Sequence, residues 1–202
     1  DHMDRKSSYV IYRPVKGLPN AYEVVVLTED RNELFARIVS TFQSYRLSIL
    51  EARIYTGKTG RVLDHFVVID NNLNSSSEEK FEELKADLIN RLDNQLPLQP
   101  PIKGRLSRHS KNFPITPEVQ LRVDAGGSHY LLSVAATDRL GILATIARVF
   151  IEFKINLITA RIATLGERIE DVFVIENPRL ADPQFAAEFE TALLKILELR
   201  PS

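Results

Sequence analysis

Hydrophobic positions follow the same order twice along the chain, in residues 22–70 and again in residues 130–177. Each stretch opens with an apolar run, continues with apolar residues at helical spacing, and closes with two further runs typical of strands. The helical positions recur every three or four residues: Leu34, Ile38, Phe42 and Tyr45 in the first stretch, and Ile142, Ile146, Phe150 and Phe153 in the second. A repeat of this regularity indicates two copies of one small structural unit.

The two copies align with a single one-residue deletion. Asp30 corresponds to Asp138, which lies 108 positions later, and the offset falls to 107 after a glycine-containing turn, so that Asp64 corresponds to Asp171. The copies therefore agree on the loop that precedes their first helix as well as on their apolar core positions.

Each copy predicts a strand, a helix, two strands and a second helix. For the first copy we expect strands at residues 23–28, 47–55 and 62–69, and a second helix from a hydroxyl-rich cap at residues 75–78 to about residue 96. In the second copy, Asp182 precedes Pro183, and a capping side chain before proline is a typical helix start. We expect that last helix to run to about residue 199.

A short extended segment precedes each copy, at residues 10–12 and 119–123, and a turn joins it to the first strand. We interpret each segment as a strand added through a hairpin. The order of the remaining elements is that of the ferredoxin-like plan, and the added strand can take the edge of that plan's last strand. The sequence therefore predicts an α+β fold of two ferredoxin-like domains in tandem, each with an antiparallel sheet, helices on one face and an added amino-terminal hairpin strand.

The domain boundaries follow from the composition between the copies. We expect one domain at residues 8–97, a linker at residues 98–117 and a second domain at residues 118–200. Besides prolines, the linker holds a basic cluster of Lys103, Arg105, Arg108 and Lys111. The strands at residues 24–27 and 172–175 are apolar on both sides, so we expect another domain or subunit, most simply the other copy, to cover a second sheet face or a sheet edge.

Composition excludes several classes of function. A formal net charge of −1 gives no sign of a polyanionic partner, and the absence of cysteine excludes disulfides and thiolate metal sites. No apolar run approaches the roughly 20 residues of a membrane-spanning helix. We expect no nucleic-acid partner, because Phe66 and its counterpart Phe173 suit core positions better than base stacking. The opening residues 1–3 are typical of a cloning remnant, so we expect a piece of a longer protein.

Motifs for catalysis are not found in the sequence. Residues 52–59 fit a relaxed phosphate-loop pattern, but Lys58 and Thr59 fall in a turn between strands rather than at a helix start. The four histidines lack the spacing of a metal site, and no G-x-S-x-G motif or Asp-x-Asp pair is present. We therefore expect no catalytic residue, no metal site and no cofactor in this chain.

The loop that precedes the first helix of the second copy is the best candidate for ligand binding. An acidic residue can cap free amides, a glycine allows close approach to the backbone, and a helix start attracts a carboxylate. The predicted effector-binding residues are Asp138, Arg139, Leu140, Gly141, Ile142, Leu143 and Asn156. Helix capping and turn formation alone account for the same residues, and that alternative stays open.

The corresponding loop of the first copy predicts a weaker site. Glu33 takes the place of Gly141, where it would block close approach and add a negative charge. The candidates there are Asp30, Arg31, Asn32 and Ser48. We therefore expect the second copy to be the sensor and the first copy to be its partner.

These residues resemble the ACT domain, a small ligand-sensing module of ferredoxin-like fold. The likeness lies in D-R-x-G-I-L-A, in N-L-x-x-A-R-I and in the G-E-R turn that leads into D-V-F-V-I, at residues 138–144, 156–162 and 166–175. Two ACT domains in tandem resemble the carboxy-terminal region of the bifunctional uridylyltransferase/uridylyl-removing enzymes, which modify the nitrogen-regulatory protein PII. This resemblance covers nearly the whole chain, and in ACT domains the ligand lies at this loop and near the position of Asn156, often between two modules.

The resemblance implies a regulatory function in nitrogen metabolism. It implies sensing of glutamine or another small amino acid, with allosteric control of UMP addition and removal by upstream catalytic domains that would use Mg²⁺ and UTP. It also implies PII as a partner through those domains, a cytoplasmic location, and a homodimer through the sheets as one arrangement of the modules. Two alternatives stay open: a stand-alone tandem-ACT regulator of a transcription factor, like the glycine-cleavage repressor, and a docking module without a ligand.

Overall fold

The computed structural model describes residues 7–31, 33–55, 60–70, 77–102 and 115–198. Several sequence predictions lie outside these described residues: residues 1–3, the site candidate Asn32, the turn with Lys58 and Thr59, the cap residues Ser75 and Ser76, and the basic cluster Lys103, Arg105, Arg108 and Lys111.

The amino-terminal unit has the predicted order with the added strand in front. It comprises β1 (Tyr9–Pro14), β2 (Ala21–Glu29), α1 (Leu34–Ser44), β3 (Leu47–Tyr55), β4 (Arg61–Asp70) and α2 (Ser77–Asp93). The second helix ends three residues before the expected residue 96, and Gln95, shortly after it, has the positive φ of 48° that breaks a helix.

The carboxy-terminal unit repeats this order. It comprises β5 (Glu118–Val123), β6 (Tyr130–Thr137), α4 (Ile142–Glu152), β7 (Asn156–Leu165), β8 (Arg168–Glu176), the short 3₁₀ helix η1 (Pro178–Ala181) and α5 (Pro183–Glu198). The predicted cap of the last helix is confirmed, because Asp182 Oδ1 accepts a hydrogen bond of 3.0 Å from the backbone N–H of Gln184. The sequence analysis did not predict η1, in which Asn177 accepts a hydrogen bond from the N–H of Arg179.

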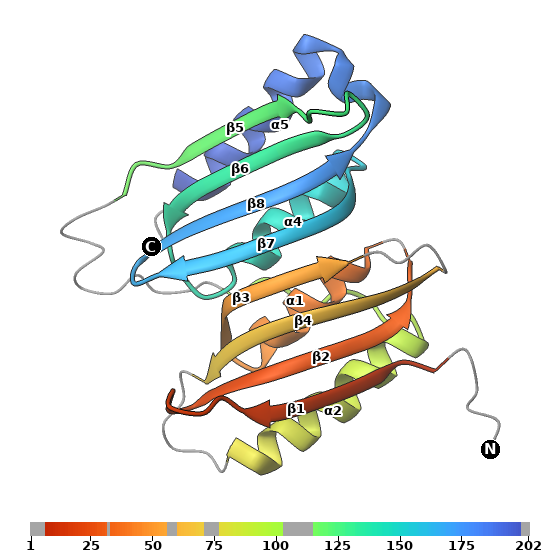
Figure 1. Ribbon diagram of the computed structural model, residues 1–202, viewed down its shortest axis with the longest axis vertical. Coiled ribbons are helices and arrows are strands. Elements are labelled where there is room, and N and C mark those ends of the chain that lie inside the picture. Colours follow the sequence, from red (N-terminus) through yellow and green to blue (C-terminus); the bar gives the residue numbers. More distant parts are fainter. Residues whose placement is uncertain (1–6, 32, 56–59, 71–76, 103–114, 199–202) are drawn as a thin grey trace.

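One antiparallel sheet of eight strands joins the two units, in the order β1-β2-β4-β3-β7-β8-β6-β5. The helices lie together on one face of this sheet, behind the strands in Figure 1. In each unit the added strand, β1 or β5, pairs with the first strand of the repeat and takes the edge that the last strand of a ferredoxin-like sheet would occupy. The predicted α+β, ferredoxin-like fold is confirmed, while the predicted domain boundaries stay a prediction.

The units meet edge to edge through β3 and β7. Backbone pairing runs from Glu51 opposite Ala163 to Tyr55 opposite Thr159. The hydroxyl of Thr159 also donates to the carbonyl of Ile54, and the hydroxyl of Thr164 donates to the carbonyl of Ile49 at 3.0 Å. This ladder satisfies two strand edges that would otherwise expose unpaired backbone groups.

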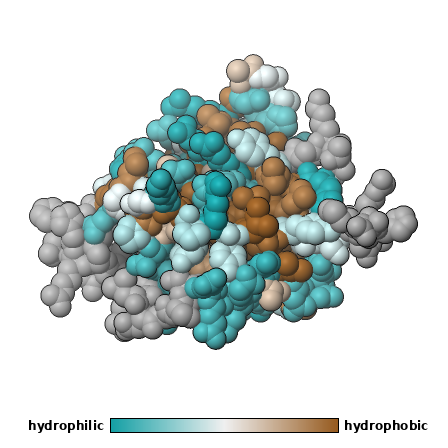
Figure 2. Space-filling view, turned by 60° about the horizontal axis from the view of Figure 1, so that its bottom comes forward, coloured by the Kyte–Doolittle hydropathy of each residue, from teal (hydrophilic) through white to brown (hydrophobic). Residues whose placement is uncertain are grey.

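Of the two arrangements that were expected, the other copy takes the sheet edge and leaves the second face of the described sheet uncovered. The other copy covers a sheet edge, because edge pairing places the units side by side in one layer. Ile11 on β1 remains 65% exposed and Leu63 on β4 remains 52% exposed. Apolar side chains accordingly gather at the surface when the β1 end is turned toward the viewer (Figure 2).

A single hydrophobic core runs beneath both units. Phe42 packs edge-on against Phe66 at a centroid distance of 5.0 Å, and their counterparts Phe150 and Phe173 pack at 5.2 Å. Phe35 of α1 reaches across to Phe173 of β8 at 6.3 Å, and α1 lies in contact with α4. The core residues therefore fix α1 of the first unit beside the sheet of the second and against α4.

Candidate functional site

The two loops that precede α1 and α4 have the same backbone geometry. The backbone N–H of Asp30 donates to the carbonyl of Gly60, and that of Asp138 donates to the carbonyl of Glu167, both at 2.8 Å. Each helix then begins at a residue with left-handed backbone, Glu33 with φ 64° and Gly141 with φ 83°, and neither helix start has a side-chain cap. The expected capping of the helix amides by the loop aspartates is therefore not found.

The loop arginines line the pockets and bind the ends of the second helices. Arg31 Nη1 donates to the carbonyl of Leu92 at 2.8 Å, at the last turn of α2. Arg139 donates to the carbonyls of Ile196 and Leu197, at the last turn of α5. Both arginines satisfy carbonyls that lack a partner within the helix, and they complement the negative end of the helix dipole. The structure thus gives Arg31 and Arg139 a structural role.

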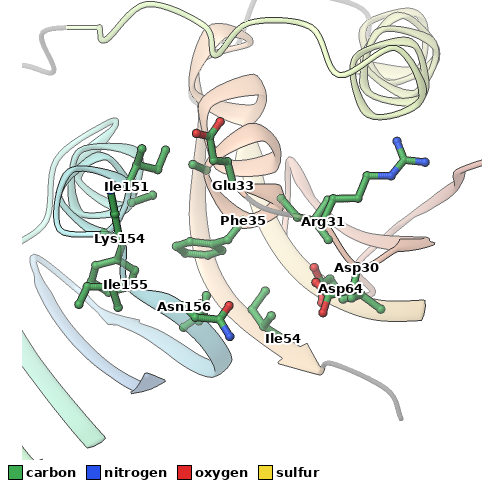
Figure 3. A pocket seen from close by; sticks show the side chains of 16 residues that line it. Asp30, Arg31, Glu33, Phe35, Ile54, Asp64, Ile151, Lys154, Ile155 and Asn156 are labelled. Carbon is green, nitrogen blue, oxygen red and sulfur yellow. The ribbon is translucent and has the colours of Figure 1, made fainter. Parts of the chain in front are cut away.

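A pocket of about 540 Å³ lies beside the loop of the amino-terminal unit. Its lining comes from both units: the loop and start of α1, neighbouring positions on β3 and β4, the end of α4, and the start of β7. Figure 3 shows the side chains of Asp30 and Asp64 beside each other on the wall of the first unit, with Lys154, Ile155 and Asn156 on the wall of the second. This volume lies in the range of small-molecule sites.

The polar groups of this large pocket carry both signs of charge. Asp64 is buried on β4, and its Oδ1 accepts a hydrogen bond of 3.4 Å from the backbone N–H of Tyr55. Burial raises the pKa of Asp64 to about 7, the Tyr55 hydrogen bond opposes this rise, and the neighbouring charge of Asp30 adds to it. Lys154 lies on the opposite wall with Asn156, whose Nδ2 faces Glu176 Oε2 at 3.5 Å.

Apolar side chains form the rest of the wall. Phe35 and Ile54 come from the first unit, and Ile151, Ile155 and Leu157 come from the second. Polar groups at fixed positions beside apolar side chains are typical of a site that orients a small polar molecule.

A second pocket, of only about 30 Å³, lies beside the loop of the carboxy-terminal unit. It combines that loop with the end of α1 and the start of β3, so it is the counterpart of the large pocket with the units exchanged. Asp171 is buried there in the place of Asp64, and burial raises the pKa of Asp171 to about 7. Burial also raises the pKa of Asp138, which adjoins it.

The structure therefore groups the predicted site residues differently from the expectation. The small pocket is lined by Asp138, Arg139, Leu140, Gly141, Ile142, Leu143 and Ser48. Asn156 lies in the large pocket with Asp30 and Arg31. The loop expected to be the stronger site thus has the smaller cavity. Each pocket takes its loop from one unit and its strand start from the other, so Asn156 and Asp138 line different pockets.

Glu33 does not close the large pocket. Its carboxylate turns back along α1, where Arg37 Nη2 lies 3.3 Å from Oε2. Figure 3 shows this carboxylate pointing away from Asp30 and Asp64. Glutamate in place of glycine therefore leaves the cavity open. It destabilises the loop instead, because a non-glycine residue has to adopt a left-handed backbone conformation there.

Sequence analysis did not select Asp64, Lys154 or Gln43 for the sites. A signal for Asp64 was present: it stands between Val62 and Phe66 at core positions of β4, and the second copy keeps the carboxylate as Asp171. A buried carboxylate in an apolar strand indicates a specific role.

The described part of the chain contains no cluster of metal-binding groups and no membrane-spanning helix. Its His, Asp and Glu side chains form no group of three or more that could hold a metal ion. None of its helices has the length and apolar character to cross a bilayer.

Comparison with known proteins gave clear relatives in sequence, although no protein-family model matched the chain. A bifunctional uridylyltransferase/uridylyl-removing enzyme of Burkholderia lata is 41% identical over 196 residues, which is 97% of this chain and 23% of that protein. The enzyme of the same name from Nitrosospira multiformis is 40% identical over 180 residues, which is 89% of this chain and 20% of that protein. Among solved structures, aspartate kinase from Synechocystis aligns with a TM-score of 0.48 and 15% identity, over 89% of this chain and 27% of that one.

Proposed function

Because the chain is homologous to one segment, about a quarter, of the bifunctional uridylyltransferase/uridylyl-removing enzymes, we propose that it is their carboxy-terminal regulatory region and that it senses glutamine. The catalytic domains would lie upstream in the same chain and would use Mg²⁺ and UTP to modify PII. The relatives favour this proposal over a stand-alone regulator of a transcription factor, because the matched proteins are several times longer than this chain.

The observation that carries the proposal is the large pocket between the units. Its volume of about 540 Å³ accommodates an amino acid, and its walls hold carboxylates on one side and a lysine on the other. A free α-amino acid carries an ammonium and a carboxylate, so this arrangement of charges complements its ends.

Each part of glutamine has a matching group in this pocket. The ammonium would lie between Asp30 and Asp64, and the carboxylate would face Lys154. The side-chain carboxamide would exchange hydrogen bonds with the amide of Asn156, which can both donate and accept. Phe35 and the adjoining isoleucines would enclose the methylene groups.

A ligand in this position would act as an allosteric effector because it contacts both units. It would stabilise the arrangement of α1, α4, β3 and β7 that forms the pocket, relative to any arrangement that separates the walls. The upstream domains would respond with a shift between adding and removing UMP. The coupling free energy would equal the difference in the free energy of glutamine binding between the two arrangements.

Isothermal titration calorimetry of this chain with glutamine tests the proposal. We expect saturable binding that weakens at least tenfold in Asn156→Ala, because that variant leaves the ligand carboxamide without its partner. The matched control is Ser48→Ala, at the corresponding position of the small pocket, which should bind like the wild type. Absence of heat at millimolar glutamine, or equal losses in both variants, would contradict the proposed site.

A further inference from the structure

The two pockets are lined mostly by equivalent positions of the repeat, but they have very different volumes. Asp138 and Asp171 in the small pocket correspond to Asp30 and Asp64 in the large one, and Ser48 corresponds to Asn156. Yet the cavities measure about 30 and 540 Å³. Serine is smaller than asparagine, so Ser48 by itself would make the small pocket the larger of the two. Another side chain must therefore fill it.

That side chain is Gln43 at the end of α1. It is 3% exposed and lines the small pocket directly against Gly141. A Cβ atom at Gly141 would lie 2.8 Å from Oε1 and 2.9 Å from Cδ of Gln43, closer than packed atoms approach one another. The carboxamide of Gln43 therefore rests on the bare backbone that the glycine provides.

The repeat shows how the two pockets differ. Position 151 corresponds to position 43, and it holds an isoleucine beside Glu33 in the large pocket. The glycine and the glutamine thus occur together in one pocket, and the glutamate and the isoleucine occur together in the other. Gly141 makes space for the carboxamide of Gln43. With that group in place, the small pocket has no room for the carboxamide of a free ligand.

The segment between the units holds Gln43 from outside. Gln43 Nε2 lies 3.5 Å from the carbonyl oxygen of Pro100. The same segment is fixed at two nearby carbonyls, where Arg37 of α1 binds that of Leu96 and Arg148 of α4 binds that of Gln99. A side chain tethered in this way competes at a high effective concentration with any free ligand.

We propose that Gln43 is a built-in occupant of the small pocket, where its carboxamide takes the place of a free amino acid's carboxamide and keeps this second site closed. This inference rests on the proposed function, since the ligand class is that of the large pocket. The chain would then bind one glutamine, in the pocket beside Asp30, and removal of the Gln43 side chain would open a second site beside Asp138.

Calorimetric titration with glutamine counts the sites. The wild type should bind one equivalent, and Gln43→Ala should bind two. Gln43→Met is the matched control, because it refills the pocket with a chain of similar length and should again bind one equivalent. Ile151→Ala, at the corresponding position of the large pocket, should leave the count at one. Circular dichroism and thermal denaturation check that each variant is folded.

The outcomes separate the two proposals. One equivalent in both the wild type and folded Gln43→Ala would overturn the role of Gln43 while retaining the large site, and two equivalents in the wild type would overturn it as well. Binding by Gln43→Ala but not by the wild type would support the role of Gln43 and contradict the large site. Absence of binding in both would overturn both proposals.

A second measurement needs no ligand. Gly141→Ala introduces a methyl group that meets the Gln43 carboxamide, so it should lower the thermal midpoint more in the wild-type background than in Gln43→Ala. Equal losses in the two backgrounds would show that the contact does not exist and would overturn the inference.

Discussion

Arg53 of β3 lies directly opposite Arg161 of β7 in the ladder that joins the two units. Both side chains are exposed, and they occupy the same position in the repeat, so pairing like edges has brought two equal charges together. Like charges directly opposite one another destabilise a strand pair. Backbone hydrogen bonds between β3 and β7, together with the shared core, therefore hold the two units together despite this repulsion.

Replacing one of these arginines with glutamate should therefore stabilise the protein. We expect Arg161→Glu to raise the free energy of unfolding by about 0.5 kcal/mol, because a repulsive pair becomes an attractive one. Urea denaturation at low and high salt measures the change, which should shrink as salt screens the charges. The exposed Arg122→Glu on β5 serves as the control, and an equal gain there would show that net charge alone is responsible.

Stability should fall as the pH rises from about 4 to about 7. In this window the folded protein keeps protons on Asp64 and Asp171, whose pKa values burial raises to about 7, while the unfolded chain has released them. Asp64→Asn should flatten this dependence by roughly 3 kcal/mol between pH 4 and pH 7. Thermal denaturation across the range measures it, with the exposed Glu170→Gln as control, and an unchanged slope in Asp64→Asn would contradict the burial of that carboxyl group in its neutral form.

Glutamine binding should release protons at a pH just below 7. A ligand ammonium between Asp30 and Asp64 favours the ionised carboxylate, so binding would lower the raised pKa of Asp64. Calorimetry in two buffers of different ionisation enthalpy should give different apparent heats for the wild type and equal heats for Asp64→Asn. Equal heats for the wild type would place the ammonium elsewhere.

Glycine at position 33 should stabilise the amino-terminal unit. Glu33 holds a backbone φ of 64°, which costs an L-residue roughly 1 kcal/mol, and its exposed ion pair with Arg37 contributes less than that. We therefore expect Glu33→Gly to raise the free energy of unfolding by about 0.5 kcal/mol, measured by urea denaturation. A loss of stability would mean that the ion pair outweighs the backbone strain.

Removing the guanidinium of Arg139 should destabilise the carboxy-terminal unit. Its hydrogen bonds to Ile196 and Leu197 satisfy carbonyls at the end of α5, and losing such bonds costs about 1–3 kcal/mol. Arg139→Met should show this loss while glutamine affinity stays within about twofold, since the large pocket lies at the other loop. A tenfold loss of affinity with unchanged stability would restore Arg139 as a ligand-binding residue.

The repeat predicted most of the fold because local patterns decide it. The helix from Leu34, the strand from Leu47 and the cap at Asp182 follow from spacing and capping chemistry that neighbouring residues carry. The added strands followed from the extended segment and turn before each copy, and their edge position followed from the missing last strand of the ferredoxin-like order. The sequence did not predict that one sheet face stays open, because the apolar strands could be buried either by edge pairing or by packing of the faces.

The site was harder to predict because it depends on contacts between the units. Asn156 lies in the same copy as Gly141, yet it lines the pocket of the other copy's loop because β3 pairs with β7. Nothing local indicates that Arg139 reaches the end of α5, or that Gln43 rests on Gly141. These are contacts between residues far apart in the sequence, which neither local patterns nor the repeat can reveal.

One glutamine should bridge the two units in the large pocket. Titration of ¹⁵N-labelled protein with glutamine, followed by ¹H–¹⁵N correlation spectra, would locate the bound ligand. We predict that the Asn156 side-chain amide and the backbone amides of residues 33–36 and 154–157 shift together with one dissociation constant, while those of residues 138–143 change little. Shifts centred on residues 138–143 with Asn156 unaffected would contradict this account.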